Sequence, residues 1–299
     1  MTGAASRPQA LAGILLVVAA SACFAALDTT TKWVSAGVPL LMALWFRYAF
    51  QAVATTLIAV PLRGRDVWRT RHLGWQLVRG VLLLASSFLA FVSLRVMPVG
   101  EFTAIVMITP LVITLLAATL LKERVSAARW ALVAGGFIGT LMIIQPGGSS
   151  FGLTSLLPLA LVACNSWFQV LTSKMARTED PVTMHLYTGW TGTLVASLAL
   201  PFVWTAVADP WLWAAMCFMG FMGAVGHFFL IMAYTRAPAG TLTPYLYAQI
   251  AFAMLGGVIV FSHVPDHLSL AGIVMIAVCG AAGAWLTVRE RREPAANAA

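Results

Sequence analysis

Charged side chains are scarce in this sequence. Of its 299 residues only 9% are Asp, Glu, Lys or Arg, whereas 61% are hydrophobic; a soluble globular chain carries about 25% charged residues. The scarcity excludes an ordinary water-soluble domain and indicates a membrane protein. Alternation of apolar and polar residues with a period of two is also absent. Because only helices or closed barrels satisfy their backbone hydrogen bonds within a bilayer, we expect the membrane spans to be helices.

Motifs for catalysis, metal binding and nucleotide binding are absent as well. The chain has no HExxH, GxSxG or P-loop sequence, and its five histidines are scattered over 72, 185, 227, 263 and 267. Cys23, Cys164, Cys217 and Cys279 each stand alone in a different apolar run, without CxxC spacing. The sequence therefore predicts no enzyme, no metal site, no cofactor and no coupling to ATP. An intramembrane enzyme and a channel remain the alternatives from other classes; a channel would need rings of polar side chains, most simply from an oligomer.

Long runs without charge are what the sequence does contain. About 20 apolar residues span the hydrocarbon core of a bilayer. The run from 130 to 173 is too long for one span, and QPGGSSFG at 145–152 divides it into two. The first run continues too far for a signal peptide, so we expect it to be a retained helix. Ten transmembrane helices are predicted near 10–30, 40–61, 74–95, 98–120, 127–145, 152–174, 181–205, 211–234, 238–262 and 267–288.

The basic residues gather on one side of these ten helices. Of 18 Lys and Arg, Lys32 and Arg95 fall on the opposite side and Arg47 falls within a helix. By the positive-inside rule the basic side is cytoplasmic, so both termini are expected in the cytoplasm, with the chain in the cell (inner) membrane. The basic stretch at 63–79 is then a loop near anionic lipid headgroups, and no role in nucleic-acid binding is expected.

The chain also repeats itself. RVMPVGEFT at 95–103 is answered by TRAPAGTLT at 235–243, and the same offset pairs Gly80 with Gly220 and Phe88 with Phe228. The prediction is two domains, 1–148 and 149–299, each with five helices. Because five is odd, the second repeat enters the membrane from the opposite side. Inverted repeats allow two conformations of similar energy, one open to each side, with the substrate between the halves. The expected fold is an all-α membrane protein of two inverted five-helix repeats around a central cavity.

This pattern resembles a known family. Proline starts the fourth and the ninth helix, LLKERVS closes the fourth, and the fifth and tenth are rich in glycine. In these features the chain is similar to the EamA-type branch of the drug/metabolite transporter (DMT) superfamily, and within it to bacterial amino acid exporters of the YddG type. The resemblance implies a basket of ten helices whose cavity is lined mainly by helices 1, 3, 4, 6, 8 and 9. The chain departs from the family in pairing Glu123 with His263, and in having no carboxylate within SACFA, where related four-helix transporters carry one in helix 1.

Polar side chains within the spans are the candidates for substrate contact, because a polar group in a bilayer needs a partner or a function. Asn165, Gln169 and Thr172 share one face of the sixth helix, Thr241, Tyr245 and Gln249 share one face of the ninth, and Gly223, His227 and Tyr234 share a stripe on the eighth. Packing between helices is the alternative for each of them. The predicted substrate-binding residues are Ser86, Ser87, Asn165, Trp167, Gln169, His227, Tyr234, Tyr245 and Gln249.

Arg47 is the one basic residue that we expect inside an apolar span. Its guanidinium could bind a substrate carboxylate. The favoured interpretation is an ion pair with Asp28 or Glu101 that forms an outer gate or holds the fold together, since these are the only carboxylates near membrane depth.

Small residues mark one further contact. Gly135 and Gly139 in the fifth helix, and Cys279 and Gly283 in the tenth, have the spacing that lets helix backbones approach closely. These faces are expected to pack against each other or against another copy of the chain. A monomer is the expectation and a homodimer is the alternative.

The predicted function is export of amino acids, aromatic or otherwise neutral, and of related metabolites by alternating access. Aromatic walls with a few amides and hydroxyls suit an amphipathic, neutral or zwitterionic molecule. The alternative within the same fold is a carrier of drugs or other metabolites. The absence of a carboxylate in mid-membrane favours facilitated transport over proton coupling.

Overall fold

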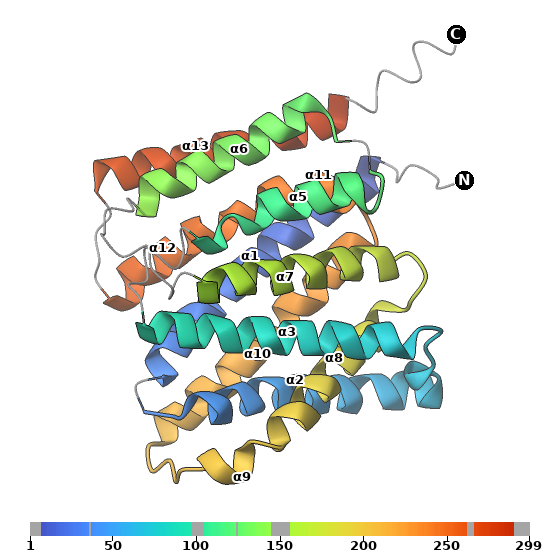
Figure 1. Cartoon of the computed structure of the whole chain (residues 1–299), viewed down its shortest axis with the longest axis vertical. Coiled ribbons are helices and arrows are strands. Elements are labelled where there is room, and N and C mark those ends of the chain that lie inside the picture. Colours follow the sequence, from blue (N-terminus) through green and yellow to red (C-terminus); the bar gives the residue numbers. More distant parts are fainter. Residues whose placement is uncertain are drawn as a thin grey trace.

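A computed structural model describes residues 7–35, 37–96, 105–123, 125–144, 156–261 and 266–289, and these ranges contain helices and no strand. The long helices lie side by side and cross Figure 1 from edge to edge. Their bounds are α1 Arg7–Val34, α2 Leu40–Arg63, η1 Gly64–Trp68, α3 Leu73–Val96, α5 Thr109–Thr119, α6 Ala127–Ile144, α7 Leu156–Met175, α8 Pro181–Ser197, α9 Leu200–Val203, α10 Pro210–Tyr234, α11 Ala239–Leu242, η3 Thr243–Tyr247, α12 Ala248–Phe261 and α13 His267–Arg289.

The all-α membrane fold is confirmed. Within the described ranges six helices are long and apolar enough to cross a membrane, namely those at 8–34, 40–68, 73–93, 156–175, 210–234 and 267–286, and α5 and α6 are shorter apolar helices. The start of α1 and the end of α13 lie at the same edge of the bundle, on the right in Figure 1. That edge, here the basic end, also carries the connections from α2 to α3 and from α7 to α8.

Two predicted spans are interrupted, and proline explains both. The seventh ends at Ser197 and is followed by the separate turn α9, in which Pro201 occupies a first-turn position. The ninth divides into α11, the 3-10 segment η3 and α12, and Pro244 stands at the start of η3. Proline has no N–H and clashes with the carbonyl four residues earlier, so it tends to kink or end an α-helix.

The main contacts between helices are equivalent in the two halves. If each of the first five spans is exchanged with its equivalent among the last five, the first with the sixth and so on, each of these contacts has a counterpart. The contact of α1 with α10 is matched by that of α7 with α3, α1 with α12 by α7 with α5, and α10 with α2 by α3 with α8. The contacts of α2 with α8 and of α6 with α13 join equivalent spans. Two structurally equivalent halves would produce this pattern. The proposed boundary between residues 148 and 149 lies outside the described residues, as does the repeated corner at 97–103.

The glycine faces of α6 and α13 pack against each other, as predicted. A Cβ placed on Gly135 would lie 2.7 Å from Cys279 Sγ, and one on Gly139 would lie 2.9 Å from the carbonyl oxygen of Gly272. Only glycine permits so close an approach at these two positions. The contact lies within one chain, so these faces do not require a second copy.

Candidate functional site

A polar cluster joins α2, α3 and α10 in the middle of the bundle. Arg47 Nη1 donates to Ser87 Oγ at 3.1 Å, and Arg47 Nη2 lies 3.0 Å from His227 Nε2. Tyr48 Oη and Ser87 Oγ are 3.0 Å apart. Gly223 makes room for the guanidinium, since a Cβ there would lie 3.2 Å from Arg47 Nε. Two predicted site residues, Ser87 and His227, are thus brought together by Arg47, which is 40 and 180 positions away from them.

His227 has a hydrogen-bond donor in this cluster that no described acceptor uses. Arginine can only donate, so Nε2 must accept from Arg47 and the neutral ring carries its proton on Nδ1. The imidazole is only 6% exposed, and Nδ1 has no hydrogen-bond partner within the described part of the chain. Phe24 and Phe168 lie against the ring, with centroids at 4.7 and 5.9 Å. The Nδ1–H of His227 is therefore available as a donor to a bound group or to a water molecule.

Asp28 and Gln249 form a second polar contact, between α1 and α12. Gln249 Nε2 donates to Asp28 Oδ2 at 2.8 Å. Asp28 is exposed and lies within the electrostatic reach of Arg47. Asp28 is not the ion-pair partner of Arg47 in this structure: the charged groups are not within 4 Å of each other, and each is held by uncharged partners. Glu101, the other predicted partner, lies outside the described residues.

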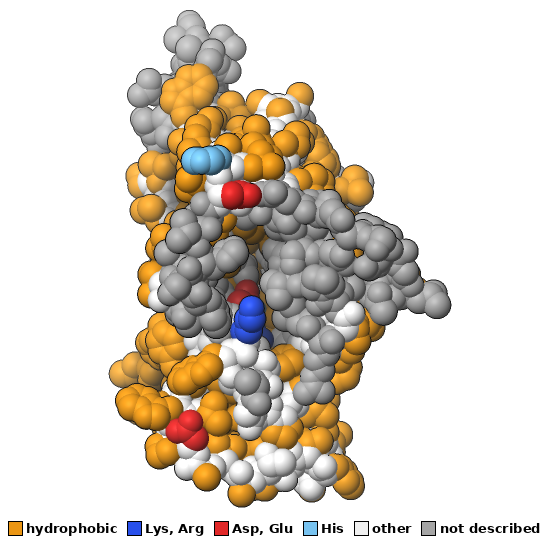
Figure 2. Space-filling view, turned by 90° about the vertical axis from the view of Figure 1, so that its left-hand side faces the viewer, with side chains coloured by type: hydrophobic (Ala, Val, Ile, Leu, Met, Phe, Trp, Pro, Cys, Tyr) orange, Lys and Arg blue, Asp and Glu red, His pale blue; other side chains and the backbone are white. Residues whose placement is uncertain are grey.

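The two charged groups lie at similar depth beneath one face of the molecule. Asp28 is six residues before the end of α1, and Arg47 is seven residues after the start of α2, which puts both roughly 9–11 Å along their helices from that end. Figure 2 looks onto this face, here the open end, and shows a hollow near its centre in which acidic and basic side chains are visible. The Asp28 carboxylate and the Arg47 guanidinium therefore lie at similar depth beneath this face, and each is bonded to uncharged partners.

The predicted residues of α7 and α10 form a separate network. Tyr234 Oη donates to Gln169 Oε1 at 2.9 Å, and Gln169 Nε2 lies 3.5 Å from Asn165 Oδ1. Tyr234 and Gln169 are 4% and 6% exposed. This network holds two helices of the second half together through uncharged groups, which is the packing role that polar residues commonly have in membranes.

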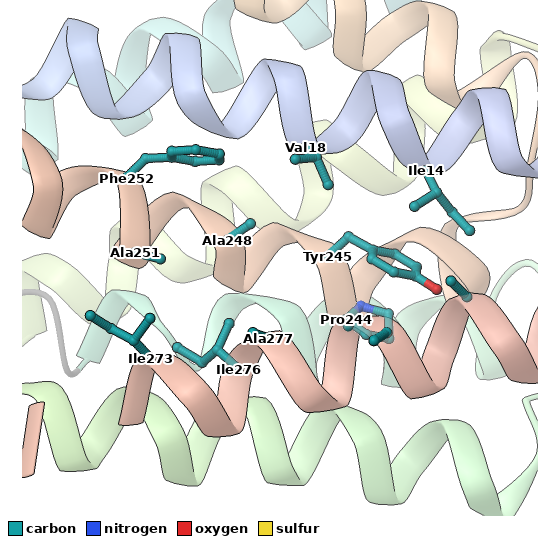
Figure 3. A pocket seen from close by; sticks show the side chains of 13 residues that line it. Ile14, Val18, Pro244, Tyr245, Ala248, Ala251, Phe252, Ile273, Ile276 and Ala277 are labelled. Carbon is teal, nitrogen blue, oxygen red and sulfur yellow. The ribbon is translucent and has the colours of Figure 1, made fainter. Parts of the chain in front are cut away.

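Three predicted site residues lie elsewhere. Trp167 is 50% exposed, and its position two residues from both Asn165 and Gln169 turns it to the opposite face of α7. Tyr245 lines an apolar pocket at the side of the bundle (Figure 3), because the 3-10 geometry of η3 rotates it off the predicted α-helical stripe. Ser86 is buried and donates to the carbonyl of Leu82, within its own helix.

Arg79 is the polar residue that the sequence interpretation missed. Placed at the border of a span, it was expected at the basic end, but its side chain is 0% exposed. Its nitrogens donate five hydrogen bonds to four acceptors, all of them uncharged: Thr172 Oγ1 at 2.9 Å, Gln76 Oε1 at 2.9 Å, the Met184 carbonyl at 3.2 and 3.3 Å, and Thr188 Oγ1 at 2.7 Å. Arg79 thereby ties α3 of the first half to α7 and α8 of the second. Gln76 three residues earlier, one turn back on the same face, is the only local signal of this site.

The basic end is closed by contacts between carboxylates and the facing half. Glu123 Oε1 accepts from Arg177 at 2.7 Å, and Glu123 Oε2 accepts from the backbone N–H of Gly240 at 3.0 Å. Glu179 accepts from Thr70 Oγ1 at 2.7 Å and from the backbone N–H of Arg71 at 3.1 Å. These bonds cross between the halves, so the halves are held together at the basic end.

No cluster of three or more His, Cys, Asp or Glu side chains able to hold a metal ion occurs in the described ranges. The site therefore offers charge and hydrogen bonds for recognition. It contains no nucleophile paired with a base within the polar clusters described above.

Comparison with known proteins agrees with a transport site. Residues 11–145 match the EamA-like transporter family. The chain is 28% identical to the riboflavin transporter of Vibrio cholerae serotype O1 over 95% of this chain and 96% of that protein. It is 27% identical to the pseudopaline exporter of Pseudomonas aeruginosa over 89% and 93% of the two chains. A solved crystal structure shares its fold, with a TM-score of 0.78, 21% identity and coverage of 93% and 98%.

Proposed function

We propose that this chain, whose residues 11–145 match the EamA-like transporter family, is a member of the drug/metabolite transporter superfamily that exports neutral amino acids, the aromatic ones above all, by alternating access. It is a multi-pass membrane transporter and not an enzyme, as its relatives along nearly the whole chain are transporters. The cargo, the direction and the mechanism are the proposed part.

The observation that carries the cargo proposal is that Arg47 and Asp28 lie at similar depth beneath one face of the molecule, each held by uncharged partners. A neutral amino acid has one carboxylate and one ammonium group. Arg47 can receive the carboxylate in a bidentate manner, and the spare Nδ1–H of His227 can donate to the same group. Asp28 can receive the ammonium group. Phe24, which packs against His227 with its ring tilted, offers an apolar wall for the side chain.

Alternating access is supported by the matching contacts of the two halves. In the described conformation the basic end is held shut by Glu123 and Glu179, while the opposite end is hollowed. Exchanging the roles of two equivalent halves would open the basic end and close the other. We place both termini and the basic end in the cytoplasm, in the inner membrane, because basic residues favour that side. In this orientation the described conformation is open to the outside.

Riboflavin is the second candidate cargo, and a specific observation favours it: the similarity to a riboflavin transporter covers 95% of this chain. Riboflavin is an amphipathic aromatic molecule without a carboxylate or an ammonium group. It would use the aromatic and amide groups of the hollow and would not need Arg47 or Asp28 as charges.

The test is transport into proteoliposomes with three indole compounds and riboflavin. Tryptophan has both charges, tryptamine lacks the carboxylate and indole-3-propionate lacks the ammonium group. For the native chain we expect tryptophan to be preferred. Arg47→Gln should raise the KM for tryptophan by about 10- to 100-fold, since a hydrogen bond to a charged group contributes about 1.5–3 kcal/mol. The same substitution should leave the KM for tryptamine unchanged. Asp28→Asn should also raise the KM for tryptophan, and it should leave the KM for indole-3-propionate unchanged.

Lys174→Gln is the matched control, because it removes an exposed charge at the basic end, far from the hollow. Riboflavin uptake that is fast in the native chain and insensitive to Arg47→Gln, with tryptophan at the level of empty liposomes, would replace amino acids with riboflavin as the cargo. The same vesicles with and without a pH gradient separate facilitated from proton-coupled transport, since accumulation driven by the gradient would exclude the facilitated mechanism.

A further inference from the structure

An apolar pocket of about 310 Å³ lies at the side of the bundle, between α1, η3, α12 and α13. Figure 3 shows Ile14 and Val18 reaching into it from α1, Phe252 and Tyr245 bordering it, and Ile273 and Ile276 on the facing helix. This size is at the lower end of the range for small-molecule sites. The pocket has no described charged side chain in its lining, and it is separate from the Arg47 cluster.

Small residues create the pocket. Ala248, Ala251, Ala277, Gly280, Ala281 and Ala284 line it, so the helices that meet there contribute little side-chain volume. An apolar space of this size holds water poorly, because Tyr245 is the one residue of its lining with a polar side-chain group, and it is filled by apolar molecules where these are at hand.

The pocket opens toward the surface that faces the bilayer. Ala277 and Ala281 of its lining are exposed, and neighbouring residues of α13 form an apolar outer surface, with Val274 61% and Val278 60% exposed. The helix α13 has no Asp, Glu, Lys or Arg before Arg289, so this surface lies at membrane depth. The molecule present at that depth in large excess is the hydrocarbon chain of a lipid.

We propose that this pocket is a lipid site that takes one acyl chain of a bilayer lipid. The chain enters between Ala277 and Ala281 and lies against Phe252 and the ring of Tyr245. It fills space beside η3, the segment in which the ninth span loses its α-helical hydrogen bonding, and so supports this segment from the outside of the transport path. A short 3-10 stretch within a span is a common place for bending, which makes its neighbour a natural position for a structural lipid.

The experiment uses the full chain in nanodiscs that contain a lipid with a photoreactive diazirine on its acyl chain. After irradiation, mass spectrometry of peptides measures the labelling of residues 244–252. The filling variant is Ala277→Trp, whose indole would occupy the pocket. The matched control is Val278→Trp, which adds the same side chain at the adjacent, outward-facing position that does not line the pocket. We expect labelling of 244–252 to fall by about tenfold or more in Ala277→Trp and to stay unchanged in Val278→Trp.

A second filling variant on another helix, Ala251→Leu, keeps the test valid if Ala277→Trp does not fold. Monodisperse elution and an unchanged thermal midpoint identify the folded variants. Equal labelling of 244–252 in the native chain and in a folded filling variant would overturn the proposal, and so would cross-links to a second copy of the chain in place of lipid. The result is independent of the cargo, because no transport is measured.

Discussion

Replacing Arg79 tests whether its charge is stabilised by the five hydrogen bonds that it donates. We expect Arg79→Lys to destabilise the protein more than Arg79→Met, although lysine keeps the charge. The acceptors lie on three helices, at Thr172, Gln76, Thr188 and the Met184 carbonyl, and the guanidinium reaches them with three nitrogens. Lysine has one nitrogen with three donors. It therefore loses at least two of five bonds and leaves a buried charge with too few partners.

The magnitudes follow from these contacts. A hydrogen bond to a charged group contributes about 1.5–3 kcal/mol, so the loss of two costs about 3–6 kcal/mol for lysine. Methionine removes the charge together with its desolvation penalty. Thr172 and Thr188 keep their own donations, to the carbonyls of Phe168 at 2.7 Å and Met184 at 2.8 Å. In Arg79→Met the groups left without a partner are therefore acceptors and not donors. This substitution should lower the free energy of unfolding by about 1–3 kcal/mol.

Thermal unfolding in detergent, with fluorescence-detected gel filtration as the readout, measures which of the two variants has the lower thermal midpoint. A difference of about 2 kcal/mol corresponds to roughly 4 °C or more in the midpoint. Arg63→Lys is the control, because its ion pair with Asp180 is exposed and should contribute at most about 1 kcal/mol. A lysine variant as stable as the native protein, with the methionine variant unfolded, would refute the reasoning, since it would mean that the charge alone and not the set of five bonds holds α3 to α7 and α8.

Three further results are expected. Gly139→Ala should lower the thermal midpoint by an amount equivalent to about 1–3 kcal/mol, because its Cβ would meet a backbone oxygen at 2.9 Å, whereas Gly74→Ala has nothing within 4 Å and should not lower it. In a chain without native cysteines, Thr178→Cys and Ala206→Cys, both exposed, should be labelled from opposite sides of intact cells, and labelling from one side would contradict the topology. Glu123→Gln should cost less than about 1 kcal/mol in stability, yet it should raise the labelling of Thr178→Cys, since it loosens the contacts that close the basic end; unchanged labelling would show that Glu123 is no part of a closure.

The helical membrane fold could be predicted because it depends on composition along the chain. Runs of apolar residues require helices wherever they occur, and the spacing of Gly135 and Gly139 was enough to predict the close contact with α13. The site could be predicted only in part. His227, Ser87 and Gln249 were identified as candidates because a polar group within a span needs a partner, but the partners that the structure gives to Asp28 and His227, Gln249 and Arg47, were not foreseen.

Two errors have clear physical causes. Arg79 stands at the border of a span, where a basic side chain usually extends to the water, and no local feature distinguishes one that turns inward. Tyr245 was placed with Gln249 on the assumption of an unbroken α-helix, but Pro244 converts the segment to 3-10 geometry and changes the direction of the following side chain.

What the sequence alone determined is the class of protein, the positions of most spans and the asymmetry of charge between the two ends, because these depend on which residues follow one another along the chain. The tertiary structure decided which polar groups meet. Arg47 and His227 are 180 residues apart, and Asp28 and Gln249 are 221 apart. Their contacts depend on how each helix is rotated about its own axis and on which helix lies next to it, and these are fixed by packing between helices.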